Sequence, residues 1–292
     1  MGNKTLFGIL CGLGAAAIWG GMYVVSKVVL DVIPPFTLVS LRLLLGSLTL
    51  VLILLWRGRP TLTRSQVLNI LGVGLVGYGI SLSLQFLGTK LSTAANGSLV
   101  TSATPAFVLL FAWLILKERI TTRRLLALGL ATLGVIAVID PRYAQLNTDL
   151  FLGNLLLIGA ALTWALYSVL VRKVTQSIDV LGFSLLAFIG GLPITVPAAA
   201  WEWNTVGIGA ITPGIIGGVL FLGIISTALA MMLWNLAFLV LDASQASLTF
   251  FAQPVVGTLL GWGFLGEQIT PLFLIGGLLI GLGLVISGTE DS

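Results

Sequence analysis

The chain has 292 residues, of which 58% are hydrophobic and only 8% are charged, and its formal net charge is +4. An ordinary soluble domain carries roughly 25% charged residues, so this composition excludes a soluble globular protein and is typical of a membrane protein. The chain has no His and a single Cys. This excludes Ser-His-Asp and Cys-His catalysis, most imidazole metal sites and an internal disulfide. We therefore expect no enzyme, no metal and no cofactor.

Apolar runs follow one another along the whole chain, each near the ~20 residues that cross a bilayer. They lie at 6–30, 36–56, 66–88, 92–116, 123–139, 150–171, 179–200, 213–238, 243–265 and 271–288. The first run continues for a full membrane span, so we interpret it as a mature helix rather than a cleaved signal. The pattern predicts an all-α integral membrane protein with ten transmembrane helices.

Small residues are frequent in these runs, with 36 glycines in the chain. Glycines spaced by four residues let helices approach closely in lipid. Close helix contacts are therefore predicted at the pairs Gly8/Gly12, Gly257/Gly261 and Gly277/Gly281.

Positive charge is distributed unevenly between the two sides of the predicted membrane. If the N-terminus lies inside, the outer side holds only Lys90 and Arg142. The inner side then holds ten residues, namely Lys4, Arg57, Arg59, Arg64, Lys117, Arg119, Arg123, Arg124, Arg172 and Lys173. Cytoplasmic loops carry an excess of Lys and Arg, so both termini are predicted to be cytoplasmic.

An internal repeat connects two distant parts of the chain. "AANGSLVTSATPAFVLLFAWLILKERIT" (94–121) aligns without gaps on "ASQASLTFFAQPVVGTLLGWGFLGEQIT" (243–270), and "GAAAIWGGMYVVSK" (14–27) aligns on "GAALTWALYSVLVR" (159–172). We interpret these matches as a duplication of a five-helix unit, 1–145 and 146–292. Because five is odd, the second unit enters the membrane inverted, and a site is expected near the midplane between the halves.

Two residue types recur at equivalent places in the repeat. Glu118 and Glu267 each follow a Trp-ended helix, and we expect them to cap the next helix and fix the turn rather than to catalyse. Pro105 and Pro254 remove a backbone hydrogen bond and are expected to kink their helices near mid-membrane.

Aromatic residues deep in the predicted helices are candidates for a central cavity. Trp19 and Trp164 are repeat equivalents, each about 20 Å along its helix at 1.5 Å per residue. Tyr23 and Tyr167 lie one turn further on, and Tyr78 is also deep. The alternative is that these rings only fill helix packing.

Amides supply a second group of candidates. Asn96 and Gln245 are repeat equivalents, and Gln245, Thr249 and Gln253 fall at i, i+4 and i+8 on one helix face. Gln85 is expected to add a polar contact. Hydrogen bonding between helices is the alternative role for all of them.

Lys27 and Arg42 are the two charged residues inside the predicted spans, and we regard them as possible anion or gate contacts. Lys27 has an alternative partner in Asp31 at i+4. An interior with one or two cations suits zwitterions or anions better than organic cations.

The motifs "IWGGMYVVSK" and "PPFTLVSLR" (18–42), together with the two copies at 94–121 and 243–270, resemble the EamA group of the drug/metabolite transporter (DMT) superfamily. The resemblance covers essentially the whole chain. It implies two five-helix units and a metabolite carrier of a bacterial-type inner (cytoplasmic) membrane. The Trp- and Tyr-rich interior is most similar to amino-acid and aromatic-metabolite exporters of the YddG type.

The leading hypothesis is therefore a small-metabolite exporter, with amino acids as substrates, that works by alternating access as a monomer in lipid, with no nucleic-acid partner. All ten acids fall near interfaces or in loops, which favours facilitated transport over proton antiport. Alternatives are a nucleoside, sugar-phosphate or nucleotide-sugar carrier, proton-coupled drug efflux and, from another class, a membrane scaffold. A sugar-phosphate carrier would need several converging cations, and a scaffold would not need mid-membrane aromatics in both repeats.

Overall fold

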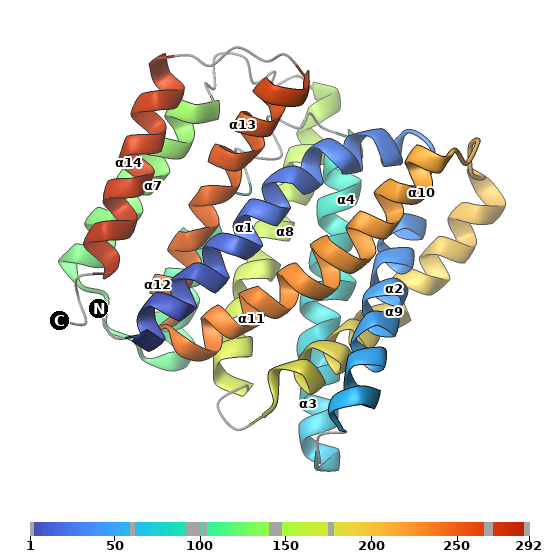
Figure 1. Cartoon of the computed structure of the whole chain (residues 1–292), viewed down its shortest axis with the longest axis horizontal. Coiled ribbons are helices and arrows are strands. Elements are labelled where there is room, and N and C mark those ends of the chain that lie inside the picture. Colours follow the sequence, from blue (N-terminus) through green and yellow to red (C-terminus); the bar gives the residue numbers. More distant parts are fainter. Residues whose placement is uncertain are drawn as a thin grey trace.

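The computed structural model describes residues 3–58, 62–91, 101, 104–139, 148–174, 178–265 and 271–288. Within these ranges the chain is helical apart from short connections, and no strand occurs there (Figure 1). The helices of the first half are α1 (Asn3–Leu30), α2 (Pro35–Arg57), α3 (Arg64–Gly74), η1 (Leu75–Ser81), α4 (Leu82–Leu91), α6 (Thr104–Phe111), η2 (Ala112–Leu116) and α7 (Thr122–Ile139). Those of the second half are α8 (Thr148–Val174), α9 (Val180–Thr205), α10 (Pro213–Leu220), η5 (Phe221–Leu229), α11 (Ala230–Val240), α12 (Ala243–Leu248), η6 (Thr249–Phe251), α13 (Ala252–Leu265) and α14 (Pro271–Gly288).

Six of the described helices are long and apolar enough to cross a membrane. They are Asn3–Leu30, Pro35–Arg57, Arg64–Leu91, Leu155–Val174, Val180–Thr205 and Pro213–Val240. The other four predicted runs also hold helical residues in their described parts. That these four cross the bilayer as well stays a prediction.

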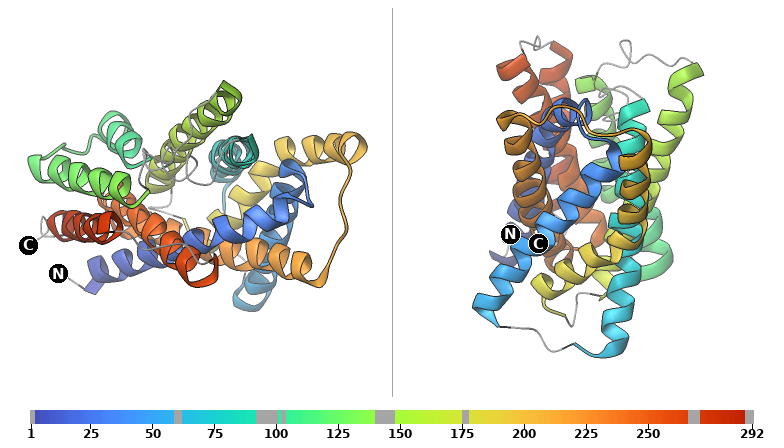
Figure 2. Two further views of the ribbon diagram at one scale, coloured as in Figure 1. Left: turned by 90° about the horizontal axis from the view of Figure 1, so that it is seen from above. Right: turned by 90° about the vertical axis from the view of Figure 1, so that its right-hand side faces the viewer.

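The helices form a bundle with two recognisable ends. At one end, which we call the terminal end, α1 begins and α2, α8 and α14 end (Figure 1). At the other, the distal end, α2 begins and α9 ends. Helices α7 and α14 pack against each other at one edge of the bundle (Figure 2). Elsewhere α2 packs on α9, α1 on α11 and α13, and α8 on α4 and α6.

Two of the long helices contain π-helical stretches, η1 and η5. Such stretches, in which a backbone N–H bonds five residues back, occur frequently at functional sites. In η5 the hydroxyl of Thr227 donates to the carbonyl of Leu222 over 2.6 Å, which satisfies an acceptor of the widened turn. The two stretches lie in the third run of each predicted repeat.

A helix irregularity lies beside one of the two predicted proline kinks, and the other lies at the start of a described helix. In the second half, the 3₁₀ turn η6 separates α12 from α13 just before Pro254. Pro254 has no N–H for the carbonyl four residues earlier, so a local irregularity is expected there. Pro105 is the second residue of α6, and residues 102–103 before that helix lie outside the described part.

Glycine allows several helices to touch, though not at every predicted pair. A Cβ at Gly8 or Gly12 would meet Leu241 or Thr249, and Gly257 lies against Gly20. The expectation for Gly277 and Gly281 is wrong, because neither has a described atom within 4 Å of its Cβ position. These two sit on the outer side of the α14–α7 pair, whereas Gly134 and Gly283 lie at the contact between the two helices.

We expect Gly74→Ala to lower the stability of the protein by about 1–3 kcal/mol. A Cβ at Gly74 would collide with the backbone carbonyl of Ala187 on α9. Gly72→Ala is the matched control on the same helix, since no described atom lies within 4 Å of its Cβ position. Thermal unfolding of the two variants in detergent measures the difference. Equal melting temperatures would contradict this account of the α3–α9 contact.

Candidate functional site

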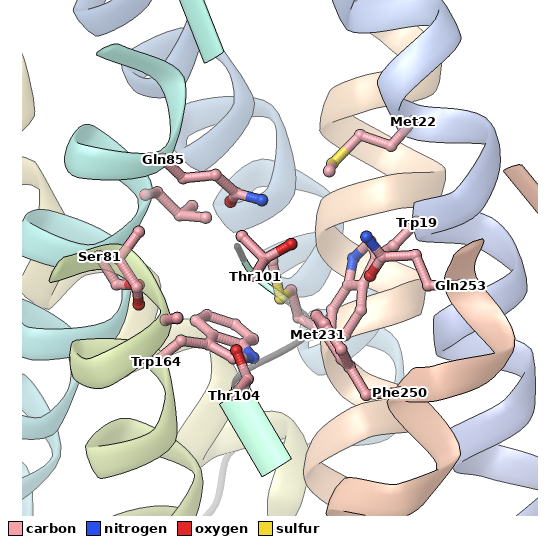
Figure 3. Close-up of a pocket in the computed structure, with 13 residues that line it drawn as sticks. Trp19, Met22, Ser81, Gln85, Thr101, Thr104, Trp164, Met231, Phe250 and Gln253 are labelled. Atoms are coloured by element: carbon pink, nitrogen blue, oxygen red, sulfur yellow. The ribbon is translucent and has the colours of Figure 1, made fainter. Parts of the chain in front are cut away.

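A cavity of about 30 Å³ lies inside the bundle. Figure 3 shows Trp19, Met22 and Gln253 across it from Ser81 and Gln85. The described lining residues are Trp19, Met22, Ser81, Leu82, Gln85, Thr101, Thr104, Ala160, Ala161, Trp164, Met231, Phe250 and Gln253. A cavity needs a volume of roughly 10–15 Å³ to hold one water, so this cavity has room for about two waters.

The wall of the cavity is aromatic and aliphatic with a few neutral polar groups. The polar members are two amides, Gln85 and Gln253, and three hydroxyls, Ser81, Thr101 and Thr104. None of the described lining residues carries a charge. Apolar walls with a small number of placed polar groups are typical of small-molecule sites.

Trp19 on α1 and Trp164 on α8 form the aromatic part of the wall. Their ring centroids are 5.6 Å apart with an interplanar angle of 82°, an edge-to-face arrangement. The indole N–H of Trp19 donates to the carbonyl of Ser226 over 3.0 Å. The indole Nε1 of Trp164 is buried and has no hydrogen-bond partner among the described residues.

The predicted tyrosines Tyr78 and Tyr167 lie one layer behind the wall. Their hydroxyls are 2.5 Å apart, and Tyr167 also donates to Oδ1 of Asn235 over 2.8 Å. Both are fully buried and neither lines the cavity. The ring of Tyr167 occupies the space where Gly77 would carry a Cβ, so it is directed into the η1–α8 contact.

The predicted amides separate into two groups. Gln85 and Gln253 line the cavity, and the amide of Gln85 donates to the hydroxyl of the half-buried Tyr23 over 2.9 Å. Tyr23 is thus a partner of a lining residue and not itself part of the wall. Gln245 is buried away from the cavity, because η6 interrupts the helix between Gln245 and Gln253. Asn96 lies outside the described residues.

Of the two predicted cations, Lys27 and Arg42, the structure describes the side chain of Arg42 only. The side chain of Lys27 lies outside the described part of the chain. Arg42 is fully buried on α2, with hydrogen bonds to Ser226 and Thr227. It does not line the cavity, but it shares a partner, Ser226, with Trp19.

Trp234 is a central residue that the sequence reasoning missed. It is fully buried, its ring centroid is 5.3 Å from that of Trp19, and its N–H donates to the hydroxyl of Ser168 over 3.1 Å. The neighbouring Asn235 bonds Tyr167 and Ser184. Asn235 is the one amide in the run 213–238. This isolated polar residue is the feature of the sequence that indicates an interior position for Trp234 and Asn235 on α11. Met22, Met231 and Phe250 were missed because apolar residues at such positions look like ordinary core.

At the terminal end, charged residues from both halves of the chain form an ion-pair network. Arg124 contacts Asp242 at 2.6 Å and Glu118 at 3.4 Å, and Arg172 contacts Asp242 at 3.5 Å. Glu118 also accepts the backbone N–H of Ala243 over 2.9 Å. The network therefore connects the start of α7 with the end of α8 and the start of α12.

The role expected for Glu118 differs in the structure. It was expected to cap the helix that follows it, α7. Instead the hydroxyl of Thr121 accepts the N–H of Arg124 at that helix start, over 3.2 Å, and Glu118 caps α12 of the other half. The left-handed backbone of Lys117, with φ of 59°, ends η2 and begins the turn that carries Glu118. The equivalent Glu267 lies outside the described residues.

At the distal end, a buried carboxylate holds α2 against α9. Glu202 accepts the backbone N–H of Thr37 over 2.8 Å and its hydroxyl over 3.1 Å. Nearby, Trp201 and Trp203 are each 63% exposed, and Trp56 at the terminal end is 91% exposed. Exposed Trp at both ends of the bundle fits the aromatic belts of membrane interfaces.

The chain matches the model of the EamA-like transporter family over residues 6–139 and again over 151–289. It belongs to this family. The protein is therefore an integral membrane transporter of the EamA group within the DMT superfamily.

Relatives of this transporter span nearly its full length. It is 25% identical to the uncharacterized transporter YoaV of Bacillus subtilis strain 168, over 97% of this chain and 96% of that protein. It is 27% identical to a Salmonella typhimurium protein named probable amino-acid metabolite efflux pump, over 92% of this chain and 91% of the other. A solved crystal structure matches the fold with a TM-score of 0.80 at 20% identity, covering 96% of both chains.

Proposed function

We propose that this transporter exports small metabolites, amino acids with aromatic and hydrophobic side chains included, through the cavity between Trp19 and Trp164. The observation that carries the proposal is the wall itself, in which two indoles from equivalent positions on α1 and α8 face each other and one N–H has no partner among the described residues. Aromatic rings bind apolar side chains, while the two amides suit the polar end of an amino acid. The name of the Salmonella relative supports the same substrate class.

We further propose that the chain is built from two inverted five-helix repeats, 1–145 and 146–292. The helix contacts support this, because several of the main helix pairs have a counterpart when the halves are exchanged. The pair α1–α11 corresponds to α8–α4, α1–α13 to α8–α6, and α2–η5 to α9–η1. The pairs α2–α9 and α7–α14 correspond to themselves. The double match of the family model is consistent with the same division.

The small volume of the cavity indicates how transport proceeds. Space for about two waters does not hold an amino acid, so the halves must move apart to admit one. The ion-pair network of Glu118, Arg124, Arg172 and Asp242 closes the terminal end. The Glu202–Thr37 contact holds helices together at the distal end. Alternate release of the two ends would expose the cavity to each side in turn.

The terminal end is proposed to face the cytoplasm of a bacterial-type inner membrane, where the chain works as a monomer with lipid and substrate as its partners. In a Cys11→Ala background, Trp203→Cys is expected to react with a membrane-impermeant thiol reagent added outside intact cells. Arg123→Cys, at the opposite end, is expected to react only after the cells are opened. Both residues are exposed on the protein. Labelling of Arg123→Cys from outside would overturn the orientation.

Transport is proposed to be facilitative, down the gradient of the substrate, because no carboxylate lines the cavity among the described residues. Proton-driven carriers commonly place an acid or a His where substrate and protons meet. With equal labelled amino acid on both sides of a liposome, an imposed pH gradient is expected to cause no net accumulation. Accumulation that a protonophore abolishes would favour the proton-coupled alternative.

The function itself is tested with purified protein in liposomes. Uptake of labelled phenylalanine, tryptophan and leucine is expected to exceed that of protein-free liposomes, with nucleosides and sugar phosphates near background. Preference for nucleosides or sugar phosphates would support the carrier alternatives instead. No transport of any member of the panel would contradict the proposed substrate class.

A further inference from the structure

Arg42 is a fully buried cation on α2 whose described contacts are all with neutral groups. Its Nε donates to the hydroxyl of Thr227 over 3.0 Å, and its Nη2 to the hydroxyl of Ser226 over 3.2 Å. The guanidinium carbon lies 4.9 Å from the ring centroid of Phe86. These contacts orient the guanidinium on the π-helical stretch η5 but do not neutralise it.

One arm of this guanidinium has no hydrogen bond. Nη1 is buried without a partner, and no salt bridge to Arg42 occurs among the described residues. Arg124 and Arg172, by contrast, each contact a carboxylate. A buried charge is costly unless it is paired. An unpaired cation that the fold holds in place is therefore a site for an anion.

Arg42 is connected to the wall of the cavity through Ser226. The hydroxyl of Ser226 contacts Arg42, while the carbonyl of the same residue accepts the indole N–H of the lining Trp19. On the other side, Phe86, on which the guanidinium stacks, directly follows the lining Gln85. Outward movement of Trp19 or Gln85 when the cavity expands would bring Nη1 to its wall.

We propose that Arg42 binds the carboxylate of the transported metabolite when the cavity opens, so that the substrate class is a carboxylic acid with an apolar body. The inference rests on the proposed function and makes its substrate class more specific. The guanidinium offers a planar fork that fits a carboxylate through two N–H donors. The indoles of Trp19 and Trp164 would then contact the apolar body of the same molecule.

The test compares acids with their amides, which differ in the carboxylate and keep the side chain. Thermal stabilisation of the purified full-length protein by phenylalanine, leucine and tryptophan is measured against the three matching amino-acid amides. Transport of the same six compounds is measured in liposomes. Each measurement uses the wild type, Arg42→Gln, Arg42→Lys and, as matched control, Arg57→Gln. Arg57 lies exposed at the terminal end of the same helix.

The wild type is expected to bind at least one acid about tenfold or more tightly than its amide, the size expected for a charge-assisted hydrogen bond. Arg42→Gln should remove this preference, Arg42→Lys should keep part of it, and Arg57→Gln should leave it unchanged. Equal binding of acids and amides by the wild type, or no binding of any acid, would overturn the proposal without requiring any variant to fold. A preference that survives Arg42→Gln would overturn it too.

The two proposals fail in different ways. If the acid preference depends on Arg42 but no compound crosses the liposome membrane, the carboxylate site stands and the transport of amino acids does not. If amino acids and amides cross equally well, transport stands and the role of Arg42 does not. Inorganic phosphate, added as a competitor, is expected to displace the acid weakly, since it lacks the apolar body that the Trp wall contacts. Complete displacement would assign the site to free anions and overturn the substrate assignment.

Discussion

Replacing Trp164 by alanine is expected to lower amino-acid transport at least about tenfold. The substitution removes one of the two facing indoles of the cavity and its Nε1 donor. An aromatic contact contributes roughly 0.5–1.5 kcal/mol beyond the burial of its surface, and about 1.4 kcal/mol corresponds to tenfold. The measurement is initial uptake of labelled phenylalanine into liposomes that contain equal amounts of folded protein.

Two further variants separate the contributions of Trp164. Trp164→Phe keeps an aromatic ring and removes the indole N–H. A transport rate between the rates of the wild type and of Trp164→Ala would assign part of the loss of transport to the missing N–H donor. Trp56→Ala removes an indole that is 91% exposed and is expected to transport normally. If Trp164→Ala also transports normally, the cavity does not carry the substrate at this residue.

Reversing the charge of Arg124 is expected to open the terminal end of the protein. Arg124→Glu would place a third carboxylate beside Glu118 and Asp242, and it would remove both the 2.6 Å contact with Asp242 that holds α7 to the start of α12 and the 3.4 Å contact with Glu118. The side chain of Asp242 is 40% exposed. The closed terminal end is therefore expected to lose roughly 1–2 kcal/mol of stabilisation, a value between those of exposed and buried ion pairs. That corresponds to a roughly 5- to 30-fold shift toward the open state.

The double variant Arg124→Glu with Asp242→Arg is the control for this prediction. It restores an opposite-charge pair at the same place, while Glu118 and Arg172 each then face a like charge, so it is expected to recover part of the transport that the single variant loses. Proteolysis or thiol labelling at the terminal end reports the opening directly. If the double variant is no better than the sum of the two single variants, the pair does not close this end.

The helical character of the chain and the depth of residues along its helices were predictable, because apolar length and position in a run depend on the sequence alone. The depth of Trp19 and Trp164 followed from their distance to the ends of their runs, and the repeat paired them. The structure brings both to one cavity. Gln85 and Gln253 could be proposed for the same reason, as polar side chains in runs that lipid does not solvate.

The identity of the remaining wall depends on how helices pack, which the sequence does not display. Tyr167 lies behind the wall because Gly77 leaves room for its ring. Gln245 lies away from the cavity because a 3₁₀ turn separates it from Gln253. Glu118 finds its partner Ala243 at a separation of 125 residues, a contact made only when the two halves come together.

Accessibility of the cavity during transport tests the central claim most directly. In a Cys11→Ala background, Ala161→Cys places a thiol in the wall without removing a hydrogen bond, while Ala187→Cys places one in a buried helix contact outside the cavity. The proposed mechanism predicts that Ala161→Cys in oriented liposomes reacts with an impermeant thiol reagent from either side. Transported amino acid should protect it, and Ala187→Cys should not react. Continued transport with Ala161→Cys unreactive from one or both sides, or reactive but unprotected by substrate, would contradict alternating access through this cavity.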